Sequence, residues 1–579
     1  MKKNTLKRVL SYIGRYKYLL PVSLLFAIIS VFVTLSVPYL IGEAIDLIIG
    51  PMNVDLERII TILFAVIILI GIGALSSWIM STINNSITYR VARDVRADAF
   101  NKIQKLPFSY IDTTPHGDTI NRITNDTEQF SEGLLLGFTQ LFTGILTIIG
   151  TLTMLVIIDY RIAIVVAVLT PLSLFCARFI ANRTHKLFVM QSEAKAESTA
   201  YINEILEGEK VVKALSHEDE AISDFEVINE KLSRCSLNAI FSSSLTNPTT
   251  RFVNNTVYAV VALVGAMLAI GSGDGALLIG ELSCLLAYAN QYTKPFNEIS
   301  GVIAEFQNAL ASAGRVFELI DEGEETPEDE NAITVQKAKG EIVFEGVNFS
   351  YTDEKPLLEN INLTVKPGQR VAIVGPTGSG KTTLINLIMR FYDVKGGAIL
   401  LDGLDIRVLT RKSLRESFGM VLQDTWLGTG TVRDIIKVGR PDASDDEVIL
   451  AAKAAHAHSF IKRLPLGYDT YIDESGGGLS QGQKQLLAIT RVMLDIPPMV
   501  ILDEATSSID TRTEIKINDA FMKMMQGRTS FIVAHRLSTI KNADIILVMK
   551  DGNIVESGSH SELLERNGFY RELWDAMTA

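Results

Sequence analysis

The sequence predicts an all-α membrane domain of six helices fused to a cytoplasmic α/β domain that carries a phosphate-binding loop. The chain has 579 residues, which is too long for one hydrophobic core, and 47% of its residues are hydrophobic. Long runs without charge are confined to the first half, whereas short apolar runs alternate with helical patterns in the second half. The second half also contains the phosphate-loop pattern G-x-x-x-x-G-K-[ST].

Four segments of the first half contain no charged residue and reach the ~20 residues that a helix needs to cross a bilayer. They are residues 18–41, 59–89, 133–158 and 252–273. Two weaker candidates carry charges near one end or in their second half. The first run is too long for a cleavable signal peptide. We therefore expect a transmembrane domain over residues 1–320 with six helices, at about 18–41, 59–83, 134–158, 162–181, 248–271 and 277–303.

Basic residues mark one side of this predicted domain. They gather before the first span, after the second and after the fourth, whereas the opposite loops hold only Arg58 and Arg161. Because positively charged loops stay in the cytoplasm, the N-terminus and everything after the sixth span should be cytoplasmic. The sequence thus predicts a multi-pass protein of the cell membrane, in contact with the lipid bilayer.

Charge and cysteine content exclude other classes. The net charge of −12 argues against a nucleic-acid partner, which would call for a basic footprint. Cys176, Cys235 and Cys284 are odd in number and widely spaced, so they fit neither a disulfide framework nor a metal site.

The two long cytoplasmic loops show helical patterns at 90–106 and 188–206, as expected for membrane helices that continue into the cytoplasm. Polar turns are predicted at their tips, at 109–117 and 206–216. Such extensions would act as levers that reach below the membrane.

An acidic, apolar-poor segment at 321–340 is interpreted as a solvated linker and a domain boundary. The domain after it, 341–579, alternates short β-rich runs with helical patterns, which predicts a largely parallel core sheet. The expected strands are 341–344, 361–365, 370–374, 398–401, 499–502, 530–533 and 545–550.

The phosphate loop lies between a predicted strand and a predicted helix, which is the context that its chemistry requires. Glycines let successive backbone N–H groups and the helix N-terminus face phosphate oxygens. Lys381 would reach the β- and γ-phosphates, and the Thr382 hydroxyl would ligate Mg²⁺. The predicted nucleotide-binding residues of the loop are Gly375, Pro376, Thr377, Gly378, Ser379, Gly380, Lys381, Thr382 and Thr383.

An apolar strand at 499–502 ends in two carboxylates. Asp503 would hold Mg²⁺ directly or through water, and Glu504 would orient the attacking water. Strands often end in acids, but this pair follows a phosphate loop within one α/β domain. That context favours ATP hydrolysis.

The motifs together resemble the ATP-binding cassette (ABC) family. Leu479-Ser480-Gln481-Gly482-Gln483 resembles the signature sequence of that family. Six spans followed by one cassette resemble a half-transporter of the multidrug-exporter type, as found in bacteria, so the resemblance covers the whole chain. It implies an ATPase that uses ATP and Mg²⁺ and is coupled to transmembrane transport.

The resemblance also assigns roles to single residues. Tyr351 matches the aromatic residue that stacks on adenine, Gln423 the glutamine that touches Mg²⁺ and the transmembrane domain, and His535 the γ-phosphate histidine. Because the family sandwiches ATP between two cassettes, Ser480, Gly482 and Gln483 would serve the nucleotide of a second half-transporter chain. One copy of the chain would not complete a site.

Segments 115–118 and 122–126 resemble the first coupling segment of the family. We expect the tips of both levers to transmit nucleotide state to the membrane spans. The predicted coupling residues are Tyr110, Asp112, His116, Gly117 and Val211.

The signature departs from the family pattern at one position, where Gln481 replaces the usual glycine. The segment before it, 473–478, also lacks the common Val-Gly-Glu-x-Gly pattern. The residues with which the chain would bind its own ATP are intact. The signature segment, with which it would contact the ATP of its partner, is altered. This pattern resembles the chain that owns the working site of a heterodimeric exporter, so we expect a related, non-identical partner.

Polar residues in the last two predicted spans are candidates for a substrate path, since such residues are costly in a bilayer. Interhelical hydrogen bonding is the alternative. A mixed polar and aromatic lining suits amphipathic or lipophilic solutes. The candidates are Asn254, Asn255, Tyr258, Asn290, Gln291, Tyr292 and Lys294.

The sequence therefore predicts an ATP-driven exporter of amphipathic or lipophilic, drug-like molecules that works by alternating access. A flippase for lipids or lipid-linked substrates, or a homodimeric exporter, would use the same fold. An ATP-gated channel or regulator is the alternative from another class. The substrate itself is not encoded in any motif.

Overall fold

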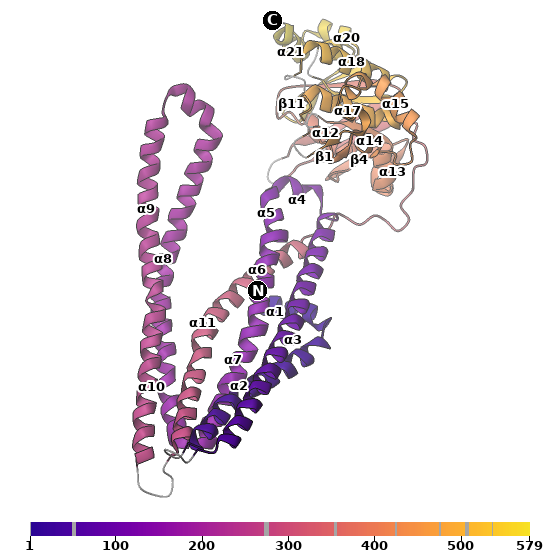
Figure 1. Cartoon of the computed structure of the whole chain (residues 1–579). Coiled ribbons are helices and arrows are strands. Elements are labelled where there is room, and N and C mark those ends of the chain that lie inside the picture. Colours follow the sequence, from indigo (N-terminus) through magenta and orange to yellow (C-terminus); the bar gives the residue numbers. More distant parts are fainter. Residues whose placement is uncertain are drawn as a thin grey trace. The chain divides into compact units, whose positions relative to one another are not determined.

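A computed structural model describes residues 2–48, 54–270, 277–352, 356–422, 425–473, 476, 478–503, 509–534 and 537–578. The chain divides into two compact units (Figure 1). The membrane unit comprises Met1–Gln104 and Pro115–Glu322, and the cassette unit comprises Lys105–Thr114 and Gly323–Ala579. A segment of ten residues between two membrane-unit helices thus belongs to the cassette unit.

Almost all described residues of the membrane unit are helical, apart from short turns and one isolated β-bridge between Ile48 and Val54. The elements of this unit are α1 (Lys2–Gly14), α2 (Leu19–Asp46), α3 (Leu56–Ile103), α5 (His116–Asn121), α6 (Thr127–Leu136), α7 (Phe142–Ile158), α8 (Tyr160–Leu215), α9 (Glu218–Ser244), α10 (Thr246–Ile270) and α11 (Ile279–Asp321), with π-helical turns η1 (Arg122–Asp126) and η2 (Gly137–Leu141).

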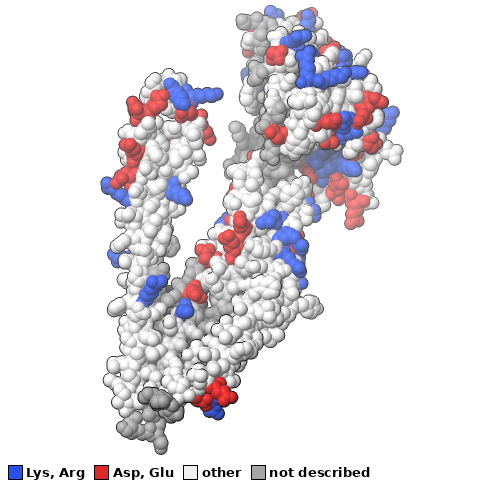
Figure 2. All heavy atoms as spheres, viewed as in Figure 1, with Lys and Arg blue, Asp and Glu red and all other residues white. Residues whose placement is uncertain are grey.

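Among the described residues, four helical runs are long and apolar enough to cross a membrane: Leu19–Asp46, Leu56–Ile103, His116–Ile158 and Glu218–Ile270. Each contains one of the predicted spans. The other two predicted spans fall in α8 and α11, where several side chains lie outside the described residues, and they stay predictions. The helices carry a broad uncharged band (Figure 2). Large apolar side chains of these helices, such as Phe64 of α3, are exposed. Lipid, rather than water, suits such a surface.

Both predicted levers are helical, but one predicted tip is wrong. The expected turn at 206–216 is helix as far as Leu215, and the chain reverses only at Ser216, whose φ of 54° is left-handed. Residues 206–215 contain no proline, so α8 continues through them and then pairs with α9 as a long hairpin (Figure 1). At the other tip, the predicted turn contains a short helix, α4 (Phe108–Thr113), between Pro107 and Pro115.

The cassette unit holds the predicted α/β fold. Its six-stranded sheet has the order β12-β11-β3-β10-β9-β6, with only β12 antiparallel. Alternate residues of its strands enter two different buried clusters: Val371 and Ile373 face one, and Ala372 and Val374 face the other. Both faces are therefore covered, as expected for a parallel sheet.

A second, antiparallel sheet with the order β2-β1-β4-β5 was not distinguished in the sequence. The strands of the unit are β1 (Ile342–Phe349), β2 (Leu358–Val365), β3 (Arg370–Val374), β4 (Gly396–Leu401), β5 (Leu404–Asp405), β6 (Phe418–Val421), β7 (Gly430–Thr431), β8 (Tyr471–Ile472), β9 (Met499–Asp503), β10 (Thr529–Val533), β11 (Ile545–Lys550) and β12 (Asn553–Gly558).

Helices surround these sheets. Besides α4, they are α12 (Lys381–Ile388), α13 (Arg411–Glu416), α14 (Val432–Lys437), α15 (Asp445–Ala454), α16 (His458–Ile461), α17 (Gln481–Leu494), α18 (Thr511–Met525), α19 (Leu537–Lys541), α20 (His560–Arg566) and α21 (Phe569–Thr578), with 3₁₀ turns η3 (Ile406–Val408) and η4 (Gly467–Asp469).

The acidic linker is not simply solvated, which corrects the sequence interpretation. Glu325 lies 3.0 Å from Arg411 and 3.3 Å from Arg415 in ion pairs, and Glu328 accepts a 2.6 Å hydrogen bond from the Arg411 backbone N–H. Arg411 is buried, so its charge needs these partners. The linker carboxylates thus dock on α13.

Candidate nucleotide site and its coupling helix

The phosphate loop joins the end of β3 to the start of α12, as the sequence predicts. Gly375 has a φ of 153°, and a Cβ added there would lie 2.2 Å from the Met549 carbonyl oxygen of the neighbouring strand β11. Only glycine fits so close an approach of two backbones. The parallel strands β10 and β11 on either side of β3 hold the loop at the carboxyl edge of the sheet.

Lys381 opens α12 and lies folded back over the loop. Its Nζ donates hydrogen bonds of 2.8 Å to the Gly375 carbonyl and 2.9 Å to the Pro376 carbonyl. Burial lowers the pKa of Lys381, and the nearby Asp503 carboxylate opposes that shift. The Lys381 ammonium thus lies on the loop and bonds to neutral carbonyl oxygens. When a nucleotide binds, phosphate oxygens could replace these carbonyls and give the ammonium a negatively charged partner.

Two hydroxyls of the loop have different surroundings. Ser379 is buried, and its Oγ has no hydrogen-bond partner among the described residues. Thr382 is exposed on the first turn of α12. An orphaned donor, a helix N-terminus and a lysine around one glycine-rich loop fit a bound phosphate chain.

Tyr351 lies next to the phosphate loop, as an adenine-stacking residue would. Its hydroxyl and the Thr383 Oγ1 are 3.0 Å apart and share a hydrogen bond. The ring makes an edge contact with Tyr392 at 5.1 Å between centroids, and about half of Tyr351 is exposed. Thr383 is therefore placed to hold the tyrosine as well as to open the helix.

Asp503 ends β9, two strands away from β3, and acts electrostatically on Lys381. With the exposed Thr382 hydroxyl, it offers the oxygen donors that Mg²⁺ prefers. The described part of the chain contains no ready-made cluster of metal-ligating side chains, so the phosphates would have to supply further ligands. Gln423, Glu504 and His535 lie outside the described residues, and their roles stay predictions.

The signature segment begins α17. Ser480 caps the helix by accepting a 3.3 Å hydrogen bond from the Gln483 N–H, and the Gln483 side chain accepts a 2.9 Å bond from the Ser480 N–H. A Cβ on Gly482 would lie 2.6 Å from the Thr513 Cγ2, so that glycine is needed for packing against α18. Gln481, in contrast, is exposed. The one altered residue of the signature points outward.

The short helix α4 is anchored on the cassette unit by aromatic and polar contacts. The Tyr392 hydroxyl donates a 2.7 Å hydrogen bond to the Asp112 carboxylate, and Phe108 stacks on Phe391 at 5.0 Å between centroids. Burial and the Asp112 carboxylate raise the pKa of Tyr392, so the hydroxyl stays protonated and donates. The Tyr110 hydroxyl is buried without a partner among the described residues.

Sequence reasoning predicted Tyr110 and Asp112 as coupling residues but did not predict that Tyr392 bonds to Asp112. Phe391 and Tyr392 follow the end of α12 after two residues, and no motif marks them. An aromatic pair just after the phosphate-loop helix is the only signal that could have pointed to them. The contacts link α4 to Tyr351 through Tyr392, because Tyr392 touches both Phe108 and Tyr351.

The remaining coupling candidates lie in the membrane unit. His116 and Gly117 begin α5 and are exposed. Val211 is exposed in the last turns of α8, before the reversal at Ser216.

The structure separates the proposed path residues by environment. Tyr292 is buried and packs against Phe296 at 5.1 Å between centroids, which is a packing role. Gln291 donates a 3.5 Å hydrogen bond to the Thr34 carbonyl of α2, while its Oε1 and the Asn254 Oδ1 are buried without described partners. Asn255, Tyr258, Asn290 and Lys294 are exposed.

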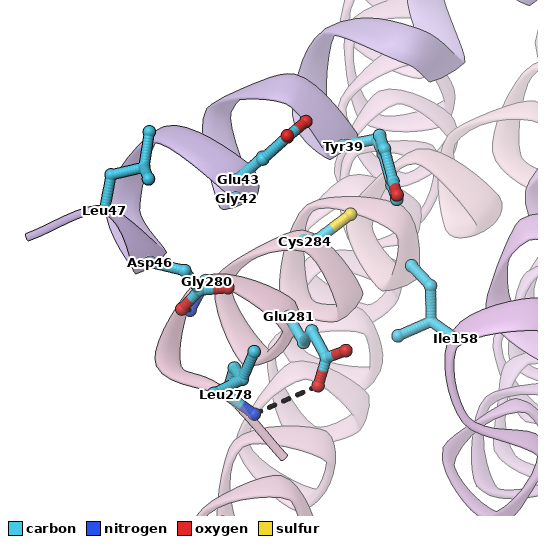
Figure 3. Close-up of a pocket in the computed structure, with 10 residues that line it drawn as sticks. All are labelled: Tyr39, Gly42, Glu43, Asp46, Leu47, Ile158, Leu278, Gly280, Glu281 and Cys284. Atoms are coloured by element: carbon cyan, nitrogen blue, oxygen red, sulfur yellow. Dashed lines mark hydrogen bonds between the residues drawn. The ribbon is translucent and has the colours of Figure 1, made fainter. Parts of the chain in front are cut away.

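A cavity of 310 Å³ lies between the end of α2, the start of α11 and the end of α7 (Figure 3). Gly42 and Gly280 face each other there, and a Cβ on Gly280 would lie 2.0 Å from the Gly42 carbonyl oxygen. Asp46 accepts a 2.6 Å hydrogen bond from the Gly280 N–H. Small residues thus let the two helices cross closely at this end.

A phosphate loop with a poised lysine, a tyrosine beside it and a serine-capped signature helix define an ATP-binding cassette, here in one chain with membrane-spanning helices. Residues 20–296 match the ABC transporter transmembrane region, and residues 358–507 match the ABC transporter domain. The chain belongs to the ABC transporter family, with the fold of an ATP-hydrolysing exporter.

Three similar proteins illustrate the relationship. The fatty acid ABC transporter ATP-binding/permease protein of Mycobacterium bovis is 41% identical, over 86% of this chain and 79% of that protein. YgaD of Bacillus subtilis, whose name assigns it provisionally to multidrug export, is 35% identical over 98% of both chains. The structure of a bacterial Atm1-family ABC exporter with ATP bound has a TM-score of 0.78 and 28% identity, covering 97% of this chain and 98% of that one.

Proposed function

We propose that this chain is one half of a heterodimeric exporter that moves amphipathic or lipophilic molecules out of the cytoplasm or the inner leaflet. The exposed Gln481 at the start of α17 carries the heterodimer proposal. Packing against α18 accounts for Gly482, whereas Gln481 faces outward, where the neighbour's nucleotide would lie. The chain's own phosphate loop is intact, so the difference concerns only what it offers its partner.

Within this chain, some residues would position the nucleotide and Mg²⁺, and others would activate the attacking water. The phosphate loop and Lys381 would hold the phosphates, and Tyr351 would stack on adenine. Thr382, Gln423 and Asp503 would hold Mg²⁺, which would neutralise charge on the phosphates. Glu504 would orient the attacking water, and His535 would contact the γ-phosphate.

Coupling would run through α4. Closure of two cassettes on ATP would move α4 with the cassette unit, because Tyr392 and Phe391 hold it there. The helices that precede and follow α4 in the chain, α3 and α5, would carry that movement toward the membrane. Val211, near the other tip, would serve the second lever in the same way.

The substrate class is supported by the names of two relatives. One is named for fatty acid transport and the other for multidrug export, and both groups of molecules combine an apolar body with a polar or charged end. Transport of fatty acids or other lipids is therefore the second candidate function, favoured by the 41% identity to the fatty acid transporter.

ATPase assays on the purified chain, reconstituted alone in nanodiscs, test the heterodimer. We expect little stimulation by any substrate, because one half of each composite site would be altered. Strong stimulation by a lipophilic cation or by oleate from this homogeneous preparation would refute the heterodimer but not the exporter.

Inside-out vesicles from source cells, with and without the gene, test the substrate class. ATP-dependent uptake of a lipophilic dye cation that is lost with the gene would support drug export. Uptake of a labelled fatty acid, but not of the dye, would favour the lipid candidate. Equal uptake of both by the two kinds of vesicle would contradict both.

A further inference from the structure

A second cavity of the membrane unit lies apart from the proposed path on α10 and α11. It has a volume of 450 Å³ and is lined by α1, α2, α3 and the η2–α7 segment. Its lining is mostly apolar and includes Leu20, Ala27, Met80, Phe138 and Phe142. A volume of this size, within the range of ~300–1,000 Å³ found for small-molecule sites, accommodates one elongated ligand.

The cavity lies at the depth of the inner leaflet. Its α2 lining extends from Leu20, near the cytoplasmic start of the first span, to Ala27. At ~1.5 Å of rise per residue these positions are about 10 Å apart, which is less than half of a hydrocarbon core of ~30 Å. On α3 the lining residues Met80 and Asn84 lie near the cytoplasmic end of the second predicted span. Any occupant would therefore come from the cytoplasmic leaflet.

Some polar side chains that line the cavity have hydrogen-bond partners, whereas its one charged side chain has no counter-ion among the described residues. Ser23 and Asn84 are buried and joined by a 2.5 Å hydrogen bond, and the Asn84 amide also reaches Thr139 at 3.5 Å. Lys17, in contrast, is exposed at the α1–α2 turn, where it lies over the Tyr18 ring, and no carboxylate of the described residues pairs with it. The one charge at the cavity is a cation without a counter-ion.

The aromatic wall comes from an irregular helix. Phe138 lies in the π-helical turn η2 and Phe142 begins α7, and their rings stack at 6.1 Å between centroids. Residues four apart are neighbours on one face of a helix, so the two rings lie close enough to stack. Their faces contribute apolar surface to the same cavity as Leu20 and Met80.

We propose that this cavity binds a single long-chain carboxylate of the inner leaflet, with the acyl chain between α2, α3 and η2 and the head group at Lys17. One apolar cavity matches one chain, and one unpaired ammonium matches one negative charge. The site is distinct from the transport path and holds whether or not the exporter is heterodimeric. A lysine at the interface with an apolar pocket below it is a complementary arrangement for such an amphiphile.

Photo-crosslinking of the full chain in phosphatidylcholine nanodiscs with a diazirine-bearing palmitate tests this site. We expect labelled peptides from α2 and from the 137–142 segment. Leu24→Phe should strongly reduce labelling because Leu24 lines the cavity, whereas the neighbouring Leu25→Phe, on an exposed position that does not line it, should not. Lys17→Gln should weaken binding about fivefold, as expected for one lysine near a charged head group.

A folding control and two comparison lipids decide whether the cavity binds the carboxylate. Binding of a fluorescent ATP analogue should be the same in all variants, which verifies that they fold. Equal labelling of the Leu24→Phe and Leu25→Phe variants would overturn the site. Equal labelling of the same peptides by diazirine-bearing phosphatidylcholine would also overturn it, because the cavity would then hold bulk lipid. Preferential labelling by the corresponding phosphatidylglycerol would overturn it too, because the occupant would then be a two-chain lipid. Unchanged palmitate binding in Lys17→Gln would remove the head-group assignment and with it the proposal.

Discussion

The cassette unit and the membrane unit place their polar chemistry by different means. In the cassette unit the backbone makes the site: Gly375 admits a neighbouring strand, and Lys381 rests on main-chain carbonyls. In the membrane unit the polar groups are side chains spread along α10 and α11, some buried and some exposed. A motif can therefore locate a nucleotide site, whereas a substrate path depends on how helices rotate and pack.

Glu504→Gln should have the largest effect. It tests whether a residue assigned from a motif in the cassette unit carries ATP hydrolysis. Loss of the carboxylate that orients water should lower ATP turnover by a factor of about 100 or more, the typical contribution of a general base. Lys381 and Thr382 would keep their contacts, so binding of MgATP should persist. Turnover and nucleotide binding measured on the same purified variant check this, and near-normal turnover would remove Glu504 from its assigned role.

Tyr110→Asp should separate the two units functionally. It places a charge where the tyrosine hydroxyl is buried. Because burying an unpaired charge is costly, α4 should lose its packing contacts with the rest of the cassette unit. Basal ATPase activity should persist while substrate stimulation and export stop. Tyr110→Phe is the matched control: the hydroxyl has no described partner, so its removal should change little. Normal export by a folded Tyr110→Asp protein would exclude α4 from coupling.

Gly482→Ala and Gln481→Ala compare two adjacent signature positions. The alanine methyl at 482 would lie 2.6 Å from Thr513, so we expect the cassette to lose about 1–3 kcal/mol of stability from overpacking. Gln481→Ala should leave stability unchanged because the side chain is exposed. Denaturant unfolding of the two variants measures the difference. A destabilised Gln481→Ala protein would show that Gln481 supports its own domain rather than facing a partner.

Tyr392→Phe should have the smallest effect and would sharpen the coupling assignment. It removes the hydrogen bond to Asp112 but keeps the ring against Phe108 and Tyr351. A partly exposed hydrogen bond contributes about 0.5–1.5 kcal/mol, so substrate stimulation should fall about two- to tenfold at unchanged ATP affinity. Asp112→Asn combined with Tyr392→Phe should add little further loss. Fully additive losses would mean that the two residues act independently.

Sequence patterns predicted some elements more closely than others. The expected strands 370–374 and 545–550 coincide with β3 and β11, because buried parallel strands are continuous apolar runs. The turn at 206–216 was wrong because its polar residues are also good helix formers, and only Ser216 breaks the helix. The linker contacts of Glu325 were missed because Arg411 lies far from it in the sequence.

By itself the sequence determined the family, the phosphate loop and the order of the two domains, because these depend on local motifs and on runs of apolar residues. It also led us to predict Asp112 as a coupling residue. Only the tertiary structure decided that Tyr392 receives Asp112, that Gly482 is required by α18 while Gln481 is exposed, and that Lys17 stands at an apolar cavity. The physical reason is that these relations join residues far apart in the chain, and the packing of whole elements, rather than any local pattern, brings them into contact.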